Sequence, residues 1–245
     1  MATEARHVNN ETEIRTLIDI HVKALRAKDA DAVVLNYAED NVIITRGEMS
    51  MKKVLLLLCE GTEIFEAAAF YDVLGWSGAV GSESVQVVTV GLRSPVRCTF
   101  GLKVIPDVYL PEVDIEQFDA LAIPGGFEEF GFYDDAYSDP VTRLIQSFGE
   151  LNKPVASICV GALPVAQAGL LTGRQGTTYH LMEGRRRKQL AEFGVQVIDA
   201  PLVREGNIIT STSPATAIEV ALYLLAELTG KENADHIRHM MGFSK

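Results

Sequence analysis

From residue 51 onward, short uninterrupted apolar runs alternate along the chain with longer amphipathic segments. The apolar runs read KVLLLLC at 53–59, VQVVTVG at 85–91, FDALAIPGG at 118–126 and KPVASIC at 153–159. Runs of this length without polar alternation are typical of strands that are buried on both faces. We therefore predict four buried strands, with further strands near 176–178, Val203 and Ile208.

Helices are predicted between these strands. Their expected ranges are 63–74, 139–150 with Pro140 in the first turn, the segment from Cys159 to Leu171, 183–193, and a last long helix over 214–228. Strands that alternate with helices indicate an α/β fold, a doubly wound and mostly parallel sheet with helices on both faces. Ligands of such sheets bind beyond the carboxyl ends of the strands. The strand ends before Glu60, before Gly125 and before Cys159 are therefore the first places to look for a site.

Residues 1–50 follow a different pattern. Asn10 and Glu13 have the spacing of a capping box, an apolar helical stripe follows from Ile14 to Leu25, and 42–45 is a short strand candidate. This segment resembles the start of a SnoaL-like, NTF2-like domain, of which it holds only the opening helices and first strand. We interpret it as a short helical appendage without a catalytic role, either an inactive remnant or upstream sequence fused to a chain whose natural start is Met51.

Composition narrows the class of protein. The 245 residues are 47% hydrophobic and carry a formal net charge of -11, which argues against binding to a nucleic-acid backbone. We interpret the basic run at 185–188 as a solvated helix face rather than an anion site. Three cysteines without paired spacing favour a reducing, cytoplasmic compartment, no zinc-ligand spacing is present, and no apolar run is long enough to span a membrane.

Cys159 stands where an apolar strand gives way directly to a helix. Small residues surround it, namely Ala156, Ser157, Gly161 and Ala162. A nucleophile on a sharp strand-to-helix turn needs small neighbours, because the strand and the helix approach each other closely there. The helix N-terminus is expected to lower the pKa of the thiol. The alternative is that Cys159 is simply a small buried apolar residue.

Four segments together resemble the DJ-1/PfpI superfamily. They read CEGTEIFEAAAFYDVL at 59–74, AIPGGFEEFG at 122–131, ASICVGA at 156–162 and TSTSPATAIEVALYLLAELTGKE at 210–232. They occur in the family's order and cover essentially all of residues 51–245. The resemblance implies a flavodoxin-like fold with a cysteine nucleophile elbow, and a homodimer.

The resemblance also implies roles for individual residues. Cys159 would be the nucleophile and the redox-sensitive thiol, and Glu66 would lie against its sulfur. A carboxyl buried beside a thiolate is expected to be partly protonated, and it can then donate a hydrogen bond or carry a proton. The backbone N–H groups of Gly126 and Val160 would form an oxyanion hole. The alternative for Glu66 is an exposed helix residue, but its neighbours Phe65 and 67–69 are apolar.

The chain departs from the family's pattern in two places. Members described as intracellular proteases have histidine directly after the cysteine, whereas this chain has Val160, which argues against peptidase activity. Members with glyoxalase or deglycase activity have histidine in a T-T-H segment, whereas this chain reads GTTYHL. Tyr179 takes the aligned position and His180 follows it. Strand alternation would send them to opposite faces, so alignment favours Tyr179 and chemistry favours His180.

The remaining candidates are interpreted as follows. Cys59 ends the first strand and Cys98 lies in a loop or hairpin, and we interpret both as non-catalytic, with Cys98 a possible accessory redox site. The other histidines, His7, His21, His236 and His239, are interpreted as structural or exposed. The insert after Gly126 contains Phe127, Phe130, Phe132, Tyr133 and Tyr137, which predict either an apolar pocket rim or a dimer contact.

Three classes of function stay open. The first is a cofactor-independent enzyme that acts on small reactive carbonyls, with glyoxalase III-like or deglycase-like chemistry at Cys159 and Glu66. The second is an oxidative-stress sensor or chaperone that uses an oxidisable cysteine. The third is another hydrolase or hydratase of the superfamily, such as an isocyanide hydratase, although those enzymes place Asp near the first strand where this chain has Glu66.

Overall fold

The computed structural model describes residues 51–243 of the chain, and all structural statements below concern these residues. The chain divides into two units, Met1–Ser50 and Met51–Lys245. The elements predicted for residues 1–50, and the SnoaL-like resemblance that they carry, lie outside the described residues, as do His7 and His21.

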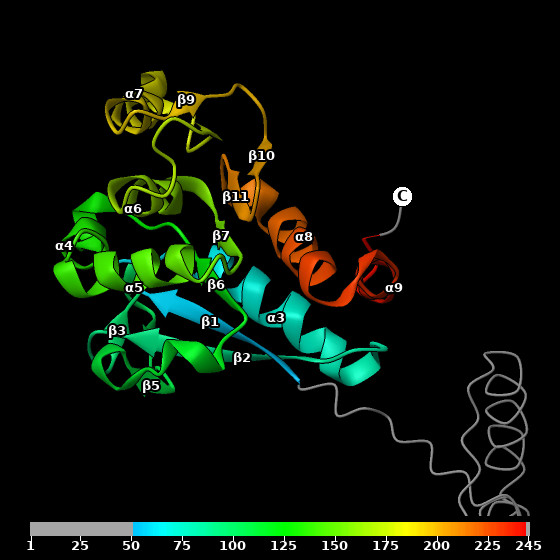
Figure 1. Cartoon of the computed structure of the whole chain (residues 1–245). Coiled ribbons are helices and arrows are strands. Elements are labelled where there is room, and N and C mark those ends of the chain that lie inside the picture. The colour runs from blue at the N-terminus through cyan, green and yellow to red at the C-terminus, as the bar shows by residue number, and fades with distance from the viewer. Residues whose placement is uncertain (1–50, 244–245) are drawn as a thin grey trace, which may run out of the picture. The chain divides into compact units, whose positions relative to one another are not determined.

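A seven-stranded sheet forms the centre of the described part (Figure 1). Its strands lie in the order β10-β11-β7-β6-β1-β2-β5. Their bounds are β1 Lys52–Leu58, β2 Val85–Gly91, β5 Val108–Tyr109, β6 Ala120–Ile123, β7 Val155–Ser157, β10 Leu202–Glu205 and β11 Ile208–Ser211. All neighbouring pairs are parallel except β10 with β11, which are antiparallel. The predicted mostly parallel sheet is confirmed. β6 and β7 are fully buried and β1 is buried from Val54 onward, whereas β2 is exposed at Gln86 and half-buried at the next two residues.

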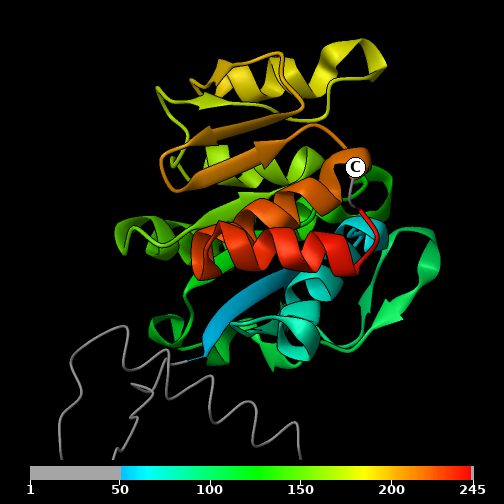
Figure 2. The same cartoon turned by 90° about the vertical axis from the view of Figure 1, so that its right-hand side faces the viewer.

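Helices cover both faces of this sheet, as Figure 1 shows. The helices α3 Ile64–Val80, α8 Ala217–Thr229 and α9 Lys231–Met240 pack together on one face. The helices α4 Phe132–Ala136, α5 Asp139–Glu150 and α6 Ala162–Gln167 lie on the other. The helix α7 Arg185–Glu192 contacts α6, lies beyond the β10–β11 edge, and is drawn in yellow at the top of Figure 2. None of the helices within residues 51–243 has the length and apolar character that crossing a membrane requires.

Three helix predictions need correction. The helix expected from Cys159 to Leu171 covers only Ala162–Gln167. The helix expected to stop at Leu74 continues to Val80. Gly75 and Gly78 weaken the local helix propensity, but the side chain of Ser77 is buried and accepts a hydrogen bond from Val85 N–H, which ties the last turns to β2. The helix α8 is also not the last one, because α9 follows Gly230 directly.

Short strands were also missed or misplaced by sequence reasoning. The pairs β3 Val96–Arg97 with β4 Lys103–Val104 and β8 Gln175–Gly176 with β9 Gln196–Val197 each form a two-stranded sheet of their own. The strand predicted at 176–178 is therefore shorter than expected and lies outside the main sheet. Strands of two residues carry too little periodicity to be recognised from sequence.

Three neighbouring strands of the main sheet end at the predicted site. β7, β6 and β1 lie side by side, and they lead to Cys159, Gly125 and Glu60 respectively. Because parallel strands end at the same edge of a sheet, these residues gather in one place. The candidate residues of the predicted site therefore stand at the ends of strands, and the sheet gives them a rigid scaffold.

A buried carboxylate connects this edge to the helix α4. Asp135 is 2% exposed and accepts hydrogen bonds from Glu60 N–H at 2.8 Å and from the Arg93 guanidinium at 2.6 Å. A buried charge is tolerated only when it is paired and fully hydrogen-bonded. Asp135 therefore fixes where α4 lies against the end of β1.

Replacement of Asp135 by Ala is expected to reduce the free energy of unfolding by about 2–4 kcal/mol, because Glu60 N–H and Arg93 lose their shared acceptor. Urea unfolding of the purified variant measures the change. The matched control is Asp134→Ala, at an exposed neighbouring position, where we expect a change within about 0.5 kcal/mol. Equal effects of the two substitutions would contradict the role of Asp135.

Candidate active site

Cys159 has a strained backbone. Its φ is 56°, in the left-handed region that residues other than glycine rarely adopt. It lies one residue beyond the end of β7 and begins a turn of 3-10 helix, Cys159–Gly161, that leads into α6. This is the geometry of a nucleophile elbow, in which a sharp turn holds the reactive side chain at the top of the sheet.

Glycine at the elbow is required by close backbone contacts. A Cβ atom on Gly161 would lie 2.6 Å from the carbonyl oxygen of Ile123, at the end of the neighbouring strand β6. The small residues predicted around Cys159 thus reflect a real steric limit.

Glu66 lies next to Cys159. It is carried by the first turn of α3, is 0% exposed, and its Oε2 accepts a hydrogen bond of 2.6 Å from Gly125 N–H. Its Oε1 is buried without a partner of regular hydrogen-bond geometry among the described residues. The Glu66 carboxyl and the Cys159 thiol are close enough for each to change the pKa of the other. Oε1 is therefore the oxygen available to share a proton with the sulfur.

Burial controls the protonation of this pair. It raises the pKa of Glu66 to about 8, against the opposing effects of the Gly125 N–H bond and of the Cys159 thiol. Burial also raises the pKa of the Cys159 thiol well above its ordinary value, the charge of Glu66 raises it further, and the Val160 N–H lowers it. Glu66 is therefore mostly protonated at neutral pH, whereas the sequence led us to expect partial protonation.

The expected lowering of the thiol pKa by the helix N-terminus is wrong. The helix α6 has only six residues, and Cys159 is 9% exposed. The cost of removing a thiolate from water therefore outweighs the helix dipole. Of the contacts to the sulfur, the Val160 N–H lowers the pKa of the thiol, whereas Glu66 raises it.

The two glycines after β6 have different surroundings. Gly125 contacts Glu66 directly, because its N–H binds Glu66 and a Cβ there would lie 2.9 Å from Glu66 Oε2 and 3.1 Å from Val160 Cγ2. Gly126 is tightly packed, since its Cβ would lie 2.4 Å from both the Gly61 carbonyl oxygen and the Phe132 ring. Sequence reasoning chose Gly126 and missed the contact of Gly125 with Glu66.

Tyr179 and His180 follow β8 in a segment without regular secondary structure. Strand alternation therefore does not decide which of them faces the site, and that premise was wrong. Tyr179 is half-buried and packs against the core, and Nδ1 of His180 is buried with no partner within residues 51–243. Thr178, which sequence reasoning passed over, donates its hydroxyl to the Cys159 carbonyl oxygen at 2.8 Å. This bond ties the GTTYHL segment to the elbow.

The aromatic insert after Gly126 splits into two parts. Phe127 and Phe130 are exposed, and with Phe100 of the β3–β4 hairpin they form a group of rings whose centroids lie 5.9–6.3 Å apart. Phe132, expected at the same rim, is fully buried in the core instead. It begins α4, whose next residue, Tyr133, is half-buried.

Arg186 does not lie on a solvated helix face as predicted. Its side chain is 14% exposed, its guanidinium carbon lies 4.9 Å from the centroid of the Tyr133 ring, and it forms an ion pair of 2.9 Å with Glu128. Because these partners come from a distant segment, only the tertiary structure could identify the contact.

The other two cysteines are buried, and their interpretation as non-catalytic stays a prediction. Burial raises the pKa of the Cys59 thiol, and it also raises that of Cys98. Cys98 directly follows β3 in the β3–β4 hairpin, as predicted.

The family model named DJ-1/PfpI family matches residues 52–227. The chain belongs to the DJ-1/PfpI family. This is the family that the four sequence motifs indicated, and the elbow with its neighbouring Glu66 lies within the matched residues.

Individual family members are similar along most of the described part. Protein dj-1beta of Drosophila melanogaster is 31% identical over 188 residues, which cover 76% of this chain and 94% of that protein. The crystal structure of Drosophila melanogaster DJ-1beta superposes with a TM-score of 0.68 at 29% identity, over 78% of this chain and 97% of that one.

Two relatives carry names that describe an activity. The glutathione-independent glyoxalase DJR-1.2 of Caenorhabditis elegans is 28% identical over 77% of this chain and 95% of its own length. Deglycase PH1704 of Pyrococcus horikoshii is 36% identical over 50% of this chain and 70% of its own length.

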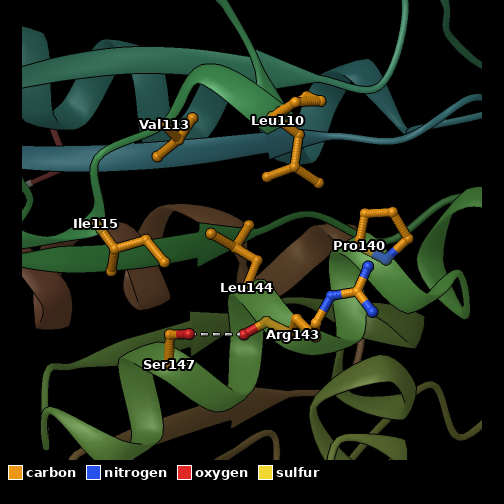
Figure 3. A pocket seen from close by; sticks show the side chains of 8 residues that line it. Leu110, Val113, Ile115, Pro140, Arg143, Leu144 and Ser147 are labelled. Atoms are coloured by element: carbon orange, nitrogen blue, oxygen red, sulfur yellow. Dashed lines mark hydrogen bonds between the residues drawn. The ribbon is translucent and has the colours of Figure 1, made fainter.

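A cavity of about 270 Å³ lies away from the elbow of this DJ-1/PfpI family member, between α5 and the segment after β5 (Figure 3). It is lined by Leu110, Pro111, Val113, Ile115, Pro140, Arg143, Leu144 and Ser147. Apart from Arg143 its lining has no ionisable side chain, and none of the candidate site residues lies there. Within residues 51–243 no group of three or more His, Cys, Asp and Glu side chains is arranged to hold a metal ion.

The raised pKa of Glu66 predicts a pH dependence of stability. The folded protein keeps the Glu66 proton up to about pH 8, whereas an unfolded glutamate releases it near pH 4.5. The free energy of unfolding should therefore decrease as the pH rises from 4.5 to 8. In Glu66→Gln this contribution is absent, so the decrease should be smaller.

Urea unfolding at several pH values between 5 and 8 measures both slopes. Glu129→Gln, at an exposed position, is the matched control and should keep the wild-type slope. If Glu66→Gln also kept it, Glu66 would not be the group that binds the extra proton.

Proposed function

We propose that this protein is a cofactor-independent, cysteine-dependent enzyme that acts on small reactive carbonyl compounds, with glyoxalase III-like or deglycase-like chemistry. The observation that carries the proposal is the pairing of Cys159, on a strained elbow, with a buried Glu66 whose pKa is about 8. A carboxyl with a pKa near neutral pH can both give and take a proton during a reaction. The names of the relatives DJR-1.2 and PH1704 support the same class.

The proposed reaction begins with Glu66 as a carboxylate, because its pKa of about 8 lies below that of the Cys159 thiol. Glu66 takes the thiol proton as the sulfur attacks the aldehyde carbon of a 2-oxoaldehyde, and it then gives this proton to the carbonyl oxygen, which forms a neutral hemithioacetal. The Glu66 carboxylate then takes the proton from that carbon and returns it to the neighbouring carbon, while the hydroxyl proton of the hemithioacetal passes to the oxygen of that neighbouring carbon. This isomerisation gives a thioester, and water releases the 2-hydroxy acid and the free thiol.

The backbone supplies the remaining groups. The Val160 N–H already contacts the sulfur, and with Gly126 N–H it is proposed to stabilise the oxygen that becomes negative when the thiolate attacks. Tyr179 and His180 are proposed to border the substrate, because Thr178 holds their segment against the elbow. Val160 occupies the position at which the peptidases of the family have histidine, so peptide hydrolysis is not part of the proposal.

The same sulfur contacts support a second candidate, redox sensing. A sulfinate formed on Cys159 would receive hydrogen bonds from the protonated Glu66 and from Val160 N–H. Against this, the thiol is buried and its pKa is raised, whereas readily oxidised cysteines are exposed thiolates. We therefore rank the enzyme first. Hydratase chemistry ranks third. The isocyanide hydratases have Asp near the first strand, where this chain has Glu66.

Methylglyoxal should be converted to lactate by the wild-type protein under reducing conditions. Both Cys159→Ser and Glu66→Gln should reduce the turnover number by about a hundredfold or more, because one removes the nucleophile and the other the proton carrier. Consumption of methylglyoxal and formation of lactate are measured together. Cys98→Ser, at a buried thiol outside the pair, should retain activity.

The assay also separates the two leading candidates. A wild-type protein that is inert toward methylglyoxal and toward early glycation adducts, while mass spectrometry shows rapid oxidation of Cys159, would replace the enzyme by the sensor.

A homodimer is proposed as the assembly, through α3 and the β3–β4 hairpin. Exposed apolar side chains gather on these two elements and on the loop segments next to them, namely Phe65, Tyr71, Phe100, Leu102 and Ile105. Between α3 and the hairpin lies a hollow of about 280 Å³, lined in part by Ala68, Tyr71, Val104 and Ile105. Exposed apolar surface around a hollow is typical of a protein interface.

Ile105→Asp should convert a dimer to a monomer, because it places a charge on the most exposed aliphatic side chain of this surface, which is 76% exposed. Light scattering coupled to size-exclusion chromatography measures the mass. Leu151→Asp, at an exposed apolar position after α5, is the matched control and should leave the dimer intact. A monomeric wild type would overturn the assembly.

A further inference from the structure

Tyr133 carries a buried hydroxyl without a hydrogen-bond partner. Its Oη is removed from solvent and has no acceptor or donor among the described residues. A buried hydroxyl left unpaired destabilises the folded protein, and most buried polar groups in folded proteins are paired. Such a group therefore calls for a partner that arrives from outside the chain.

The Tyr133 ring is held from several sides. It stacks on Tyr137 with centroids 4.9 Å apart and an interplanar angle of 28°, and it meets the edge of Phe132 at 5.3 Å. The Arg186 guanidinium lies over it at 4.9 Å and is in turn held by Glu128 and Gln189, each at 2.9 Å. Because the ring is fixed in this way, its hydroxyl already points in one direction. Binding of a ligand then costs no further side-chain entropy at Tyr133.

The position of Tyr133 connects it to Cys159. Phe132, the preceding residue, packs against Gly126, and Gly125 in turn packs against Val160 and Ile158 on either side of Cys159. Burial raises the pKa of Tyr133 against the opposing charge of Arg186, and a charge on Cys159 adds a smaller increase, so the hydroxyl keeps its proton at neutral pH and can act as a donor. Tyr133 thus presents a fixed hydrogen-bond donor within electrostatic range of the sulfur.

We propose that Tyr133 is a specificity-determining residue whose hydroxyl binds the second oxygen of a 2-oxo substrate, the one on the carbon next to the carbon attacked by Cys159. This assignment rests on the proposed function and deepens it. The attacked oxygen has Glu66 and the backbone N–H groups as partners, whereas no candidate residue named above is assigned to the second oxygen. The site would then prefer 2-oxoaldehydes, which carry both oxygens, over simple aldehydes, which carry one.

The test compares Tyr133→Phe with the wild type on methylglyoxal and on propanal. Reversible hemithioacetal formation is measured as protection of Cys159 against alkylation by iodoacetamide, which requires no turnover. With methylglyoxal the variant should need about tenfold more compound for half-protection, the loss that corresponds to one hydrogen bond. With propanal the two proteins should not differ. The steady-state kcat/KM for methylglyoxal should decrease by a similar factor.

Tyr137→Phe is the matched control, because it removes a hydroxyl from the ring stacked on Tyr133 and should behave as wild type. The melting temperature of Tyr133→Phe should be unchanged or higher, since an unpaired buried hydroxyl is removed while the ring contacts stay.

The outcomes distinguish this inference from the proposed function. The inference is supported if methylglyoxal protects Cys159 less well in the variant than in the wild type, while propanal protects both equally. This holds even if the wild type proves to have no turnover. Equal behaviour of variant and wild type overturns it even if both turn over methylglyoxal. An equal loss with propanal also overturns it, because the hydroxyl would then serve the attacked oxygen. A wild-type Cys159 that neither compound protects overturns both proposals.

Discussion

The close approach of three strand ends is the constraint on which the site depends. β7, β6 and β1 finish side by side, and the chain that follows each of them leaves no space for side chains at Gly161 and Gly125. This crowding turns the backbone at Cys159 into the left-handed region and brings Gly125 N–H against Glu66. Strain at a functional position persists only where surrounding structure holds it, and here the parallel sheet supplies that support.

The chemistry of the site follows from the same crowding. Glu66 and Cys159 are both acids, both buried, and near enough that one negative charge opposes the other. The pair therefore holds protons at a pH at which separate, exposed groups would not. A carboxyl whose pKa is close to neutral pH, beside a nucleophile, can transfer a proton between neighbouring carbons. It can also hydrogen-bond to an oxidised sulfur. The two leading functional candidates share one physical arrangement and differ in what reaches the sulfur.

Elements from distant parts of the chain complete the surroundings of the pair. α4 is fixed by Asp135 to the end of β1, and the segment after β8 is fixed by Thr178 to the elbow. Arg186 of α7 reaches the Tyr133 ring of α4 across some fifty residues of sequence. The donor that Tyr133 offers is thus placed by contacts that share no local sequence pattern.

The amino-acid sequence by itself determined the parallel α/β fold, the family, and the identity of Cys159 and Glu66 as neighbours. Long apolar runs and motifs in a fixed order are local signals, so they can be recognised from the sequence without a structure. Only the tertiary structure decided the sign of the thiol pKa shift, the role of Gly125 rather than Gly126 beside Glu66, and the contact of Arg186 with Tyr133. Desolvation, backbone contact and ring packing depend on what surrounds a residue in space, which its neighbours along the chain do not specify.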